Sequence, residues 1–122
     1  MNVYIICPVR LATPETTVKV EEYVKKLETN GHEVFWPQRD VAQDSDGLHI
    51  VNVELDAIAT ADEVHVFWDK NSKGSHFDLG AAMALDKPVR LIHSFFEDDP
   101  KETYEKVIKL KELEFSTMRL YL

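Results

Sequence analysis

Five short stretches of the chain are mostly apolar, and β-branched or aromatic residues are common in them. The first four are each flanked on at least one side by a charged residue or Pro, and all five are too short for an amphipathic helix. This pattern is typical of strands buried on both faces. The stretches are residues 2–7, 33–36, 63–68, 89–93 and 117–122.

Segments whose apolar residues have helical spacing lie between these stretches. Val20, Val24 and Leu27 recur three or four positions apart among Glu and Lys residues, and Asn30 and Gly31 supply a stop signal. We therefore expect a helix over residues 14–29. Similar spacing or small-residue composition predicts three more helices. They are a helix that begins near residue 44 or 45 and continues to about 58, a short one over 75–85 and a charged one over 100–114.

The alternation of strand and helix along the whole chain indicates an α/β fold. Continuous apolar strands joined by helices predict a mostly parallel sheet covered on both faces, and right-handed crossovers leave few topologies. We expect a flavodoxin-like or Rossmann-like three-layer sandwich of about five strands, formed by residues 1–122 as a single domain. In such a fold a ligand binds at the carboxyl ends of the strands.

Composition agrees with one ordinary globular domain. The chain has 122 residues, of which 44% are hydrophobic and 30% charged, and a chain of this length needs no covalent staple to fold. Cys7 is the sole cysteine, which excludes an intrachain disulfide and a multi-cysteine zinc site. The histidines are scattered without ligand spacing, so we expect no metal site.

The charge balance restricts the partners. Lys and Arg number 14 against 22 Asp and Glu, a net charge of -8, and such a field repels polyanions. We therefore expect no nucleic acid polymer as partner. No apolar run approaches the roughly 20 residues that cross a bilayer, and the chain opens in a strand-like segment rather than a signal region. A cytoplasmic protein without a membrane partner is the expectation.

Two loops carry residues suited to an anionic ligand. Arg10 follows the first predicted strand and faces a helix N-terminus, where it is able to pair with a phosphate or carboxylate; a plain surface arginine is the alternative. No P-loop or G-x-G-x-x-G occurs among only four glycines, which disfavours ATP-driven phosphoryl transfer and Rossmann redox chemistry. We expect no cofactor.

The segment 69–80 (DKNSKGSHFDLG) is the most informative one. Its loop offers hydroxyl, amide and backbone donors, and we expect Asp78 in the first turn of the following helix, where the dipole favours the ionised carboxylate. An ionised carboxylate at this edge is able to act on an electron-poor carbon. The competing interpretation is a capping box from Ser75 to Asp78, with no chemical role.

Several other residues have both a functional and a structural interpretation. Trp36 and Trp68 end their strands where a ring is able to stack on a base, but aromatic residues there also fill cores. Cys7 ends a buried strand and fits a small core residue better than a nucleophile. Glu54 lies beside the core-facing Leu55, and simple surface solvation is its plain alternative.

Five separated segments resemble one family, the nucleoside 2-deoxyribosyltransferase superfamily, which includes nucleoside 5′-monophosphate N-hydrolases. The segments occur in family order and span residues 3 to about 92. They are the first strand with CPVR (7–10), WPQRD (36–40), IATAD (58–62), SKGSHFDLG (72–80) and DKPV (86–89).

The resemblance implies breakage or exchange of an N-glycosidic bond. Asp78 matches the family glutamate that attacks the anomeric carbon, and Glu54 matches an acidic residue that handles the base or the leaving-group proton. Ser72 and Arg10 match contacts to the sugar's 5′ substituent, which points to a phosphate. The matched segments add four further substrate-binding candidates: Pro8, Trp36, Asp40 and Gly74. Trp68 is a fifth candidate, because it ends its strand where a ring is able to stack on a base.

The sequence departs from the family pattern at two of these positions. Asp78 is one methylene shorter than glutamate, about 1.5 Å of reach, and a misplacement near 1 Å costs on the order of a hundredfold in rate. Pro8 removes one backbone N–H from a phosphate cradle. We therefore expect Asp78 either to steer a water in direct hydrolysis or to serve binding alone.

Three functions follow from these observations. The first is carboxylate-assisted cleavage or transfer at the N-glycosidic bond of a (deoxy)nucleoside or its 5′-monophosphate. The second is a non-catalytic nucleotide-binding or sensing module of the same fold, and the third is an unrelated partner-binding domain. The family completes its sites across subunits, so the apolar tail of the chain predicts a homodimer or higher homo-oligomer. Its residues are Phe115, Met118, Leu120 and Leu122.

Overall fold

Four parallel strands form the central sheet, in the order β2-β1-β3-β4. The computed structural model describes residues 1–95 and 101–121, and side chains up to residue 116. The strands are β1 (Asn2–Ile6), β2 (Glu33–Phe35), β3 (Glu63–Trp68) and β4 (Val89–Ser94). Since β1 pairs with both β2 and β3, the chain leaves β1 at a point flanked by two other strand ends, where the strand order switches direction.

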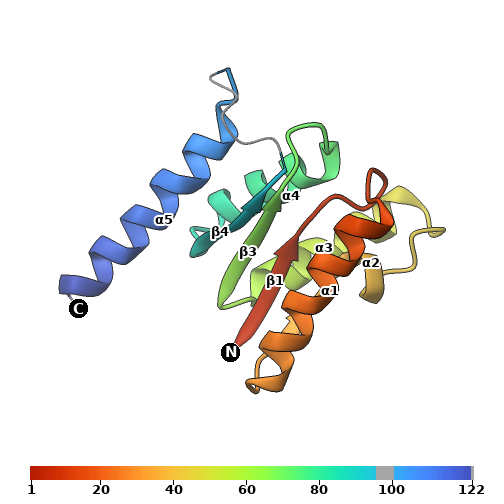
Figure 1. Ribbon diagram of the computed structural model, residues 1–122, viewed down its shortest axis with the longest axis horizontal. Helices are drawn as coiled ribbons and strands as arrows, with labels where there is room; N and C mark the ends of the chain where they lie inside the picture. The colour runs from red at the N-terminus through yellow and green to blue at the C-terminus, as the bar shows by residue number, and fades with distance from the viewer. Residues whose placement is uncertain (96–100, 122) are drawn as a thin grey trace.

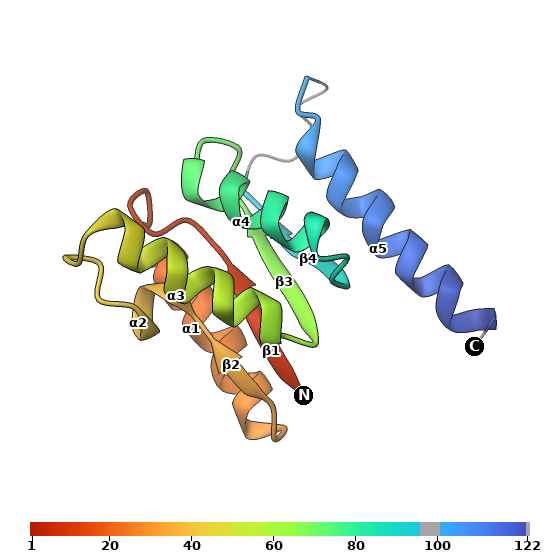
Figure 2. The same ribbon diagram turned by 180° about the vertical axis from the view of Figure 1, so that it is seen from behind.

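Five helices accompany the sheet. They are α1 (Pro14–Thr29), α2 (Pro37–Asp40), α3 (Gly47–Thr60), α4 (Lys73–Ala84) and α5 (Tyr104–Tyr121). Figure 1 shows α1 on one side of the sheet, and the reverse view in Figure 2 shows α3 and α4 on the other side. In both views α5 lies beyond β4, at the edge of the sheet. The parallel α/β architecture predicted from the alternation of elements is confirmed.

Alternate residues of the strands build a core on each face. Tyr4 and Ile6 of β1 point to the face of α3 and α4, where they pack with a buried cluster that includes Ile58 and Leu79. Val3 and Ile5 point the other way, against Val20 and Val24 of α1 and Phe67 of β3. The period of two along β1 therefore decides which side chains reach each helical layer.

The expected fifth strand at residues 117–122 is wrong. The described part of this segment, up to Tyr121, continues α5, and no Gly or Pro separates it from the charged helix before it. A helix already formed extends through apolar residues at little cost, whereas a new strand needs a break in the chain first. β4 is therefore an edge strand, and the backbone N–H of Leu91 donates to Oε2 of Glu112 on α5 at 2.9 Å.

Helix starts differ from the sequence expectations at three places. α3 begins at Gly47, with Asp46 as its N-cap, and α4 begins at Lys73, two residues earlier than expected, with Ser72 as its N-cap. α5 begins at Tyr104. The short helix α2 was not expected, because four residues are too few to show a period.

Within the described ranges, no helix has both the length and the apolar composition that crossing a membrane requires.

Candidate active site

A cavity of about 540 Å³ lies at the carboxyl ends of β1, β2 and β3. Because parallel strands end at the same edge of the sheet, the loops that follow them converge there. The loop after β1 contributes Arg10, the N-cap of α4 contributes Ser72, and α4 itself contributes Gly74 and Asp78. Glu54 of α3 lines the same cavity. The structure therefore gathers these five sequence candidates, which span residues 10 to 78, into one place.

Asp78 is the buried carboxyl group of the cavity. Its side chain is 6% exposed, and Oδ2 accepts a hydrogen bond of 2.9 Å from the hydroxyl of Tyr4. Oδ1 is buried and has no hydrogen-bond partner among the described residues. A buried carboxylate oxygen without a donor costs free energy, so Tyr4 fixes one oxygen of Asp78 and the other would gain from a donor. The carboxyl group of Glu54 is a nearby group that interacts with Asp78.

The protonation of Asp78 differs from the sequence expectation. Burial, and secondly the charge of Glu54, raise the pKa of Asp78 to about 7, against a partial opposing effect of the Tyr4 hydrogen bond. Burial likewise raises the pKa of Glu54. The expected stabilisation of the anion by the first helical turn does not apply, since α4 begins at Lys73 and Asp78 lies in its second turn. Two carboxyl groups with raised pKa values in one cavity are typical of acid–base sites.

Tyr4 is a site residue that the sequence interpretation missed. It is fully buried, and burial followed by the charge of Asp78 strongly raises its pKa, so its hydroxyl remains a proton donor to the carboxylate. The ring stacks on Phe35, with centroids 5.6 Å apart and planes inclined by 9°. The available signal was a hydroxyl-bearing residue in an otherwise aliphatic strand, on the same face as Ile6.

Ser72 has a structural role beside its candidate binding role. Its Oγ accepts hydrogen bonds from the backbone N–H of Ser75 at 3.3 Å and from the hydroxyl of Ser75 at 2.9 Å. The capping residue is therefore Ser72, and the alternative of a box from Ser75 to Asp78 is wrong. Because Ser72 accepts in both contacts, its own hydroxyl proton stays available to an anion in the cavity.

Two cationic side chains lie at the wall of the cavity. Arg10 and Lys73 are exposed, line the cavity, and form no ion pair with the residues that the structure describes. Other basic groups of the chain have an acidic partner, as Arg39 has in Glu28 and Asp40. Arg10 and Lys73 are thus suited to an anionic group of a ligand.

Four of the proposed substrate-binding residues lie outside the cavity. Trp36 and Trp68 are 6% and 1% exposed and belong to the two cores, because both point into a layer of helices rather than toward the strand ends. Asp40 accepts from the backbone N–H of Trp36 at 2.8 Å and pairs with Arg39, which fixes α2. Pro8 is buried between two lining residues and does not itself line the cavity.

Smaller apolar side chains form the wall that the tryptophans were expected to supply. Phe77, 49% exposed, comes from α4, Ile50 and Val51 come from α3, and Leu11 comes from the loop after β1. Cys7 also lines the cavity, but burial raises its pKa to about 12, which keeps the thiol protonated and agrees with the expected core role. A planar base would therefore meet one aromatic ring and aliphatic groups.

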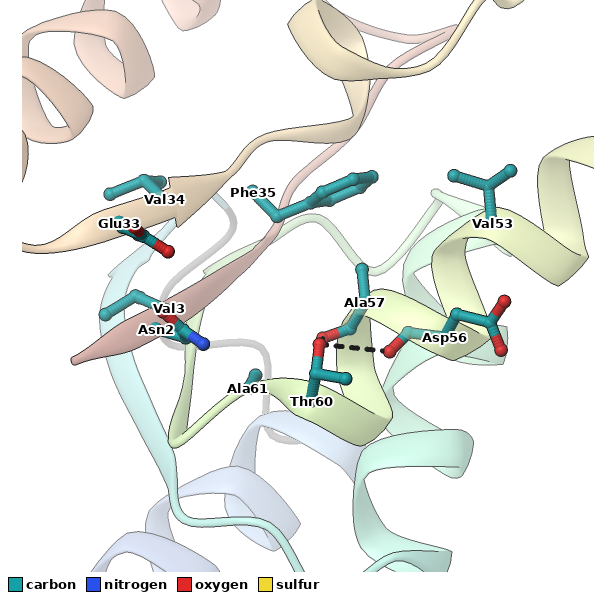
Figure 3. A pocket seen from close by; sticks show the side chains of 10 residues that line it. All are labelled: Asn2, Val3, Glu33, Val34, Phe35, Val53, Asp56, Ala57, Thr60 and Ala61. Carbon is teal, nitrogen blue, oxygen red and sulfur yellow. Dashed lines mark hydrogen bonds between the residues drawn. The ribbon is translucent and has the colours of Figure 1, made fainter.

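A second cavity of about 420 Å³ lies between β2 and α3, toward the amino ends of the strands. Figure 3 shows Phe35 reaching from β2 toward Val53 and Ala57 of α3. The hydroxyl of Thr60 at its wall already donates to the backbone oxygens of Asp56 and Ala57. This cavity is apolar at its centre, and the buried carboxyl group lies in the other one.

A metal site would need several ligands close together. Over residues 1–95 and 101–121, no group of three or more His, Cys, Asp or Glu residues is arranged to hold a metal ion.

No protein-family model and no curated protein sequence matches the chain. A 2-deoxyribosyltransferase from Bacillus psychrosaccharolyticus is similar in structure, with a TM-score of 0.68 and 21% identity over 88% of this chain and 90% of that one. The CMP N-glycosidase BcmB of Clostridium botulinum has a TM-score of 0.66 and 19% identity, over 90% and 81%.

A third similar structure comes from a eukaryote. It is described as a 2-desoxiribosyltransferase from Leishmania mexicana, with a TM-score of 0.62 and 21% identity over 78% of this chain and 65% of that one. Identities of this size establish similarity of fold. The protein therefore has the flavodoxin-like fold shared by 2-deoxyribosyltransferases and the CMP N-glycosidase, with four strands instead of the five expected.

Proposed function

We propose that the protein cleaves or exchanges the N-glycosidic bond of a (deoxy)nucleoside or its 5′-monophosphate, as a member of the nucleoside 2-deoxyribosyltransferase superfamily. The observation that carries this proposal is the state of Asp78. One oxygen is held by Tyr4 and the other is buried without a partner in a cavity that also contains Glu54. The similar structures act on bonds of this kind according to their descriptions.

The arrangement supports a division of roles. Arg10, Ser72 and the backbone at Gly74 bind the 5′-phosphate, and the apolar wall with Phe77 contacts the base. This orientation brings C1′ of the sugar to Asp78 and the glycosidic nitrogen toward Glu54. Burial raises the pKa of Glu54, which shifts this group toward the protonated form that a general acid requires.

The short side chain of Asp78 favours direct hydrolysis. In this reaction ionised Asp78 takes a proton from a water whose oxygen forms a bond to C1′. The C1′–N bond breaks, its electron pair leaves with the base, and Glu54 supplies the proton to that base. No glycosyl ester forms. A deoxyribosyl adduct on Asp78, detected by mass spectrometry after rapid acid quenching, would contradict this route.

The alternative is a nucleotide-binding module without turnover. The departure from glutamate at Asp78 and the loss of a backbone donor at Pro8 favour it. In such a module the cavity, its two cations and Ser72 retain their roles, and the carboxyl pair contributes no chemistry.

One experiment separates the two functions. The purified protein is incubated with deoxynucleosides and their 5′-monophosphates, with and without a free acceptor base, and base release and exchange are followed by chromatography. We expect release from monophosphates by the wild type and none by the Asp78→Asn variant, which keeps the shape of the side chain and an acceptor for Tyr4. Binding of the same compounds without any turnover in the wild type would establish the module instead.

A further inference from the structure

The polar groups of the cavity are unevenly distributed. Groups that donate hydrogen bonds lie on Arg10, in the loop after β1, and on Ser72 and Lys73, at the start of α4 after β3. Strands β1 and β3 are neighbours in the sheet. Glu54 of α3 and Gln43, in the loop before α3, approach from the side of β2. Since donors bind the phosphate, the base occupies the side with Glu54 and Gln43.

The orientation of the Gln43 side chain is fixed by backbone. Its Nε2 donates to the carbonyl oxygen of Pro37 at 3.1 Å and to that of Val41 at 3.3 Å. The flipped amide would place Oε1 against two carbonyl oxygens, so the hydrogen-bond pattern admits one orientation. Both N–H groups of the amide are thereby used, and Oε1 has no partner among the residues that the structure describes.

Gln43 therefore offers an acceptor, and not a donor, to whatever lies beside it. A base that carries an exocyclic amino group at the pyrimidine 4 or purine 6 position donates to such an oxygen. A base with a carbonyl at the same position brings two oxygens together and leaves both without a donor. A site that hydrogen-bonds one group discriminates against the analogue that lacks it.

We propose that Gln43 determines base specificity and selects cytosine or adenine over uracil, thymine or hypoxanthine. This inference rests on the proposed function only in requiring that a nucleotide occupies the cavity, and it holds equally for a catalyst and for a binding module. Gln43 is exposed in the free protein, so water competes for its oxygen. The expected preference is about tenfold, corresponding to roughly 1.4 kcal/mol.

Two matched ligand pairs test the preference without turnover. Binding of deoxycytidine and deoxyuridine 5′-monophosphates, and of the deoxyadenosine and deoxyinosine pair, is measured by calorimetry on the Asp78→Asn variant. Members of each pair differ at the amino or carbonyl position and in the proton of the adjacent ring nitrogen. We expect the amino ligand of each pair to bind about ten times more tightly, and the preference to fall to within twofold when Gln43→Leu is added.

Gln38→Leu is the matched control. Gln38 also uses its Nε2 within the protein, to Thr17 Oγ1 at 3.2 Å, but it does not line the cavity, so its substitution is expected to keep the preference. Melting temperatures verify folding, and Gln43→Met replaces Gln43→Leu if the latter unfolds. Equal binding within both pairs, or an undiminished preference without Gln43, would overturn the inference.

The outcomes for specificity and for catalysis are separable. Turnover of all four monophosphates at equal kcat/KM by the wild type contradicts the role of Gln43 and leaves the proposed reaction intact. A Gln43-dependent binding preference without turnover supports the role of Gln43 and contradicts catalysis. Failure of all four ligands to bind overturns both.

Discussion

Asp78 is a buried acid whose ionised form the surrounding structure does not favour. Its pKa is raised from 3.8 to about 7, so between these values the native state binds more protons than the unfolded state. Stability therefore falls as pH rises through this window, and the loss is complete above pH 7. The ionised group that the proposed chemistry requires is therefore a cost to folding, as is common at active sites.

The first prediction concerns this cost. Asp78→Asn should stabilise the protein at pH 8 by roughly 2 to 4 kcal/mol, since each pKa unit corresponds to about 1.4 kcal/mol, and should change stability little at pH 4. Urea unfolding at the two pH values measures the difference. If the difference in stability between the variant and the wild type were the same at both pH values, the raised pKa of Asp78 would be contradicted.

Tyr4 offers a second test at the residue scale. Its hydrogen bond lowers the pKa of Asp78 and so opposes the effect of burial. We expect kcat/KM of base release to rise with pH around pH 7 in the wild type, and the rise to move to higher pH in Tyr4→Phe, which lacks the hydroxyl. Phe35→Leu is the control, because it removes the stacked ring and leaves the hydrogen bond. A profile unchanged in Tyr4→Phe would remove Tyr4 from the site.

At the scale of elements, a helix cap, a hydrogen bond and ring contacts fix the start of α4. Ser72 caps the helix, and the ring of His76 bonds to the backbone oxygen of Ser72 at 2.7 Å. That ring also lies against Trp68, at 4.7 Å between centroids, and against Tyr104 of α5, at 4.9 Å. The end of the cavity proposed to bind phosphate is thus attached to β3 and to α5.

Two helix caps of equal type allow the roles of Ser72 to be separated. Thr13 caps α1 through a 3.1 Å bond from the backbone N–H of Thr16, and it does not line the cavity. We expect Ser72→Ala and Thr13→Ala each to lower stability by about 1 kcal/mol. Ser72→Ala alone should raise KM, or Kd, for a monophosphate several-fold more than for its nucleoside. If the two variants changed KM or Kd equally, Ser72 would act only as a helix cap.

The elements also show what sequence patterns were able to predict. Strands β1 to β4 and helices α1 and α3 follow from apolar runs and helical spacing, and Asp78, Glu54, Arg10, Ser72 and Gly74 follow from the motif order. Tyr4 was missed because its role depends on a contact over 74 positions. Trp36 and Trp68 were misplaced because a strand pattern does not reveal which face a terminal residue takes. The prediction of a strand at residues 117–122 was wrong because the continuous helix α5 overrides the local strand propensity of this segment.

For the whole molecule, the charge bears on ligand binding. The net charge of -8 acts against an incoming phosphate dianion, while Arg10 and Lys73 attract it at short range. Salt screens the distant charges more than the close ones. We therefore expect these two cations, rather than the field of the whole chain, to set the affinity for a monophosphate.

The same charge affects self-association. Large apolar side chains are exposed near the cavity, with Leu48 of α3 at 70% and Phe77 of α4 at 49%, and a second copy that covers them would also close the mouth of the cavity. The apolar tail of the chain is the surface first expected to form this contact. The side chains of its Met118, Leu120 and Leu122 lie outside the described part of the chain, so we propose the surface formed by α3 and α4 instead. Two chains of charge -8 repel each other, so salt should favour association.

We predict a homodimer in 0.15 M salt at micromolar concentration, twice the 14.1 kDa of the chain, by sedimentation equilibrium. Leu48→Lys should shift the protein toward the monomer, because it places a charge at the centre of the apolar contact. Leu110→Lys on α5 is the control, since Leu110 is similarly exposed at 66% but lies on α5, at the far edge of the sheet (Figure 2). A wild-type monomer under these conditions would mean that each chain carries a complete site, whereas a dimer broken by Leu110→Lys alone would move the interface to α5.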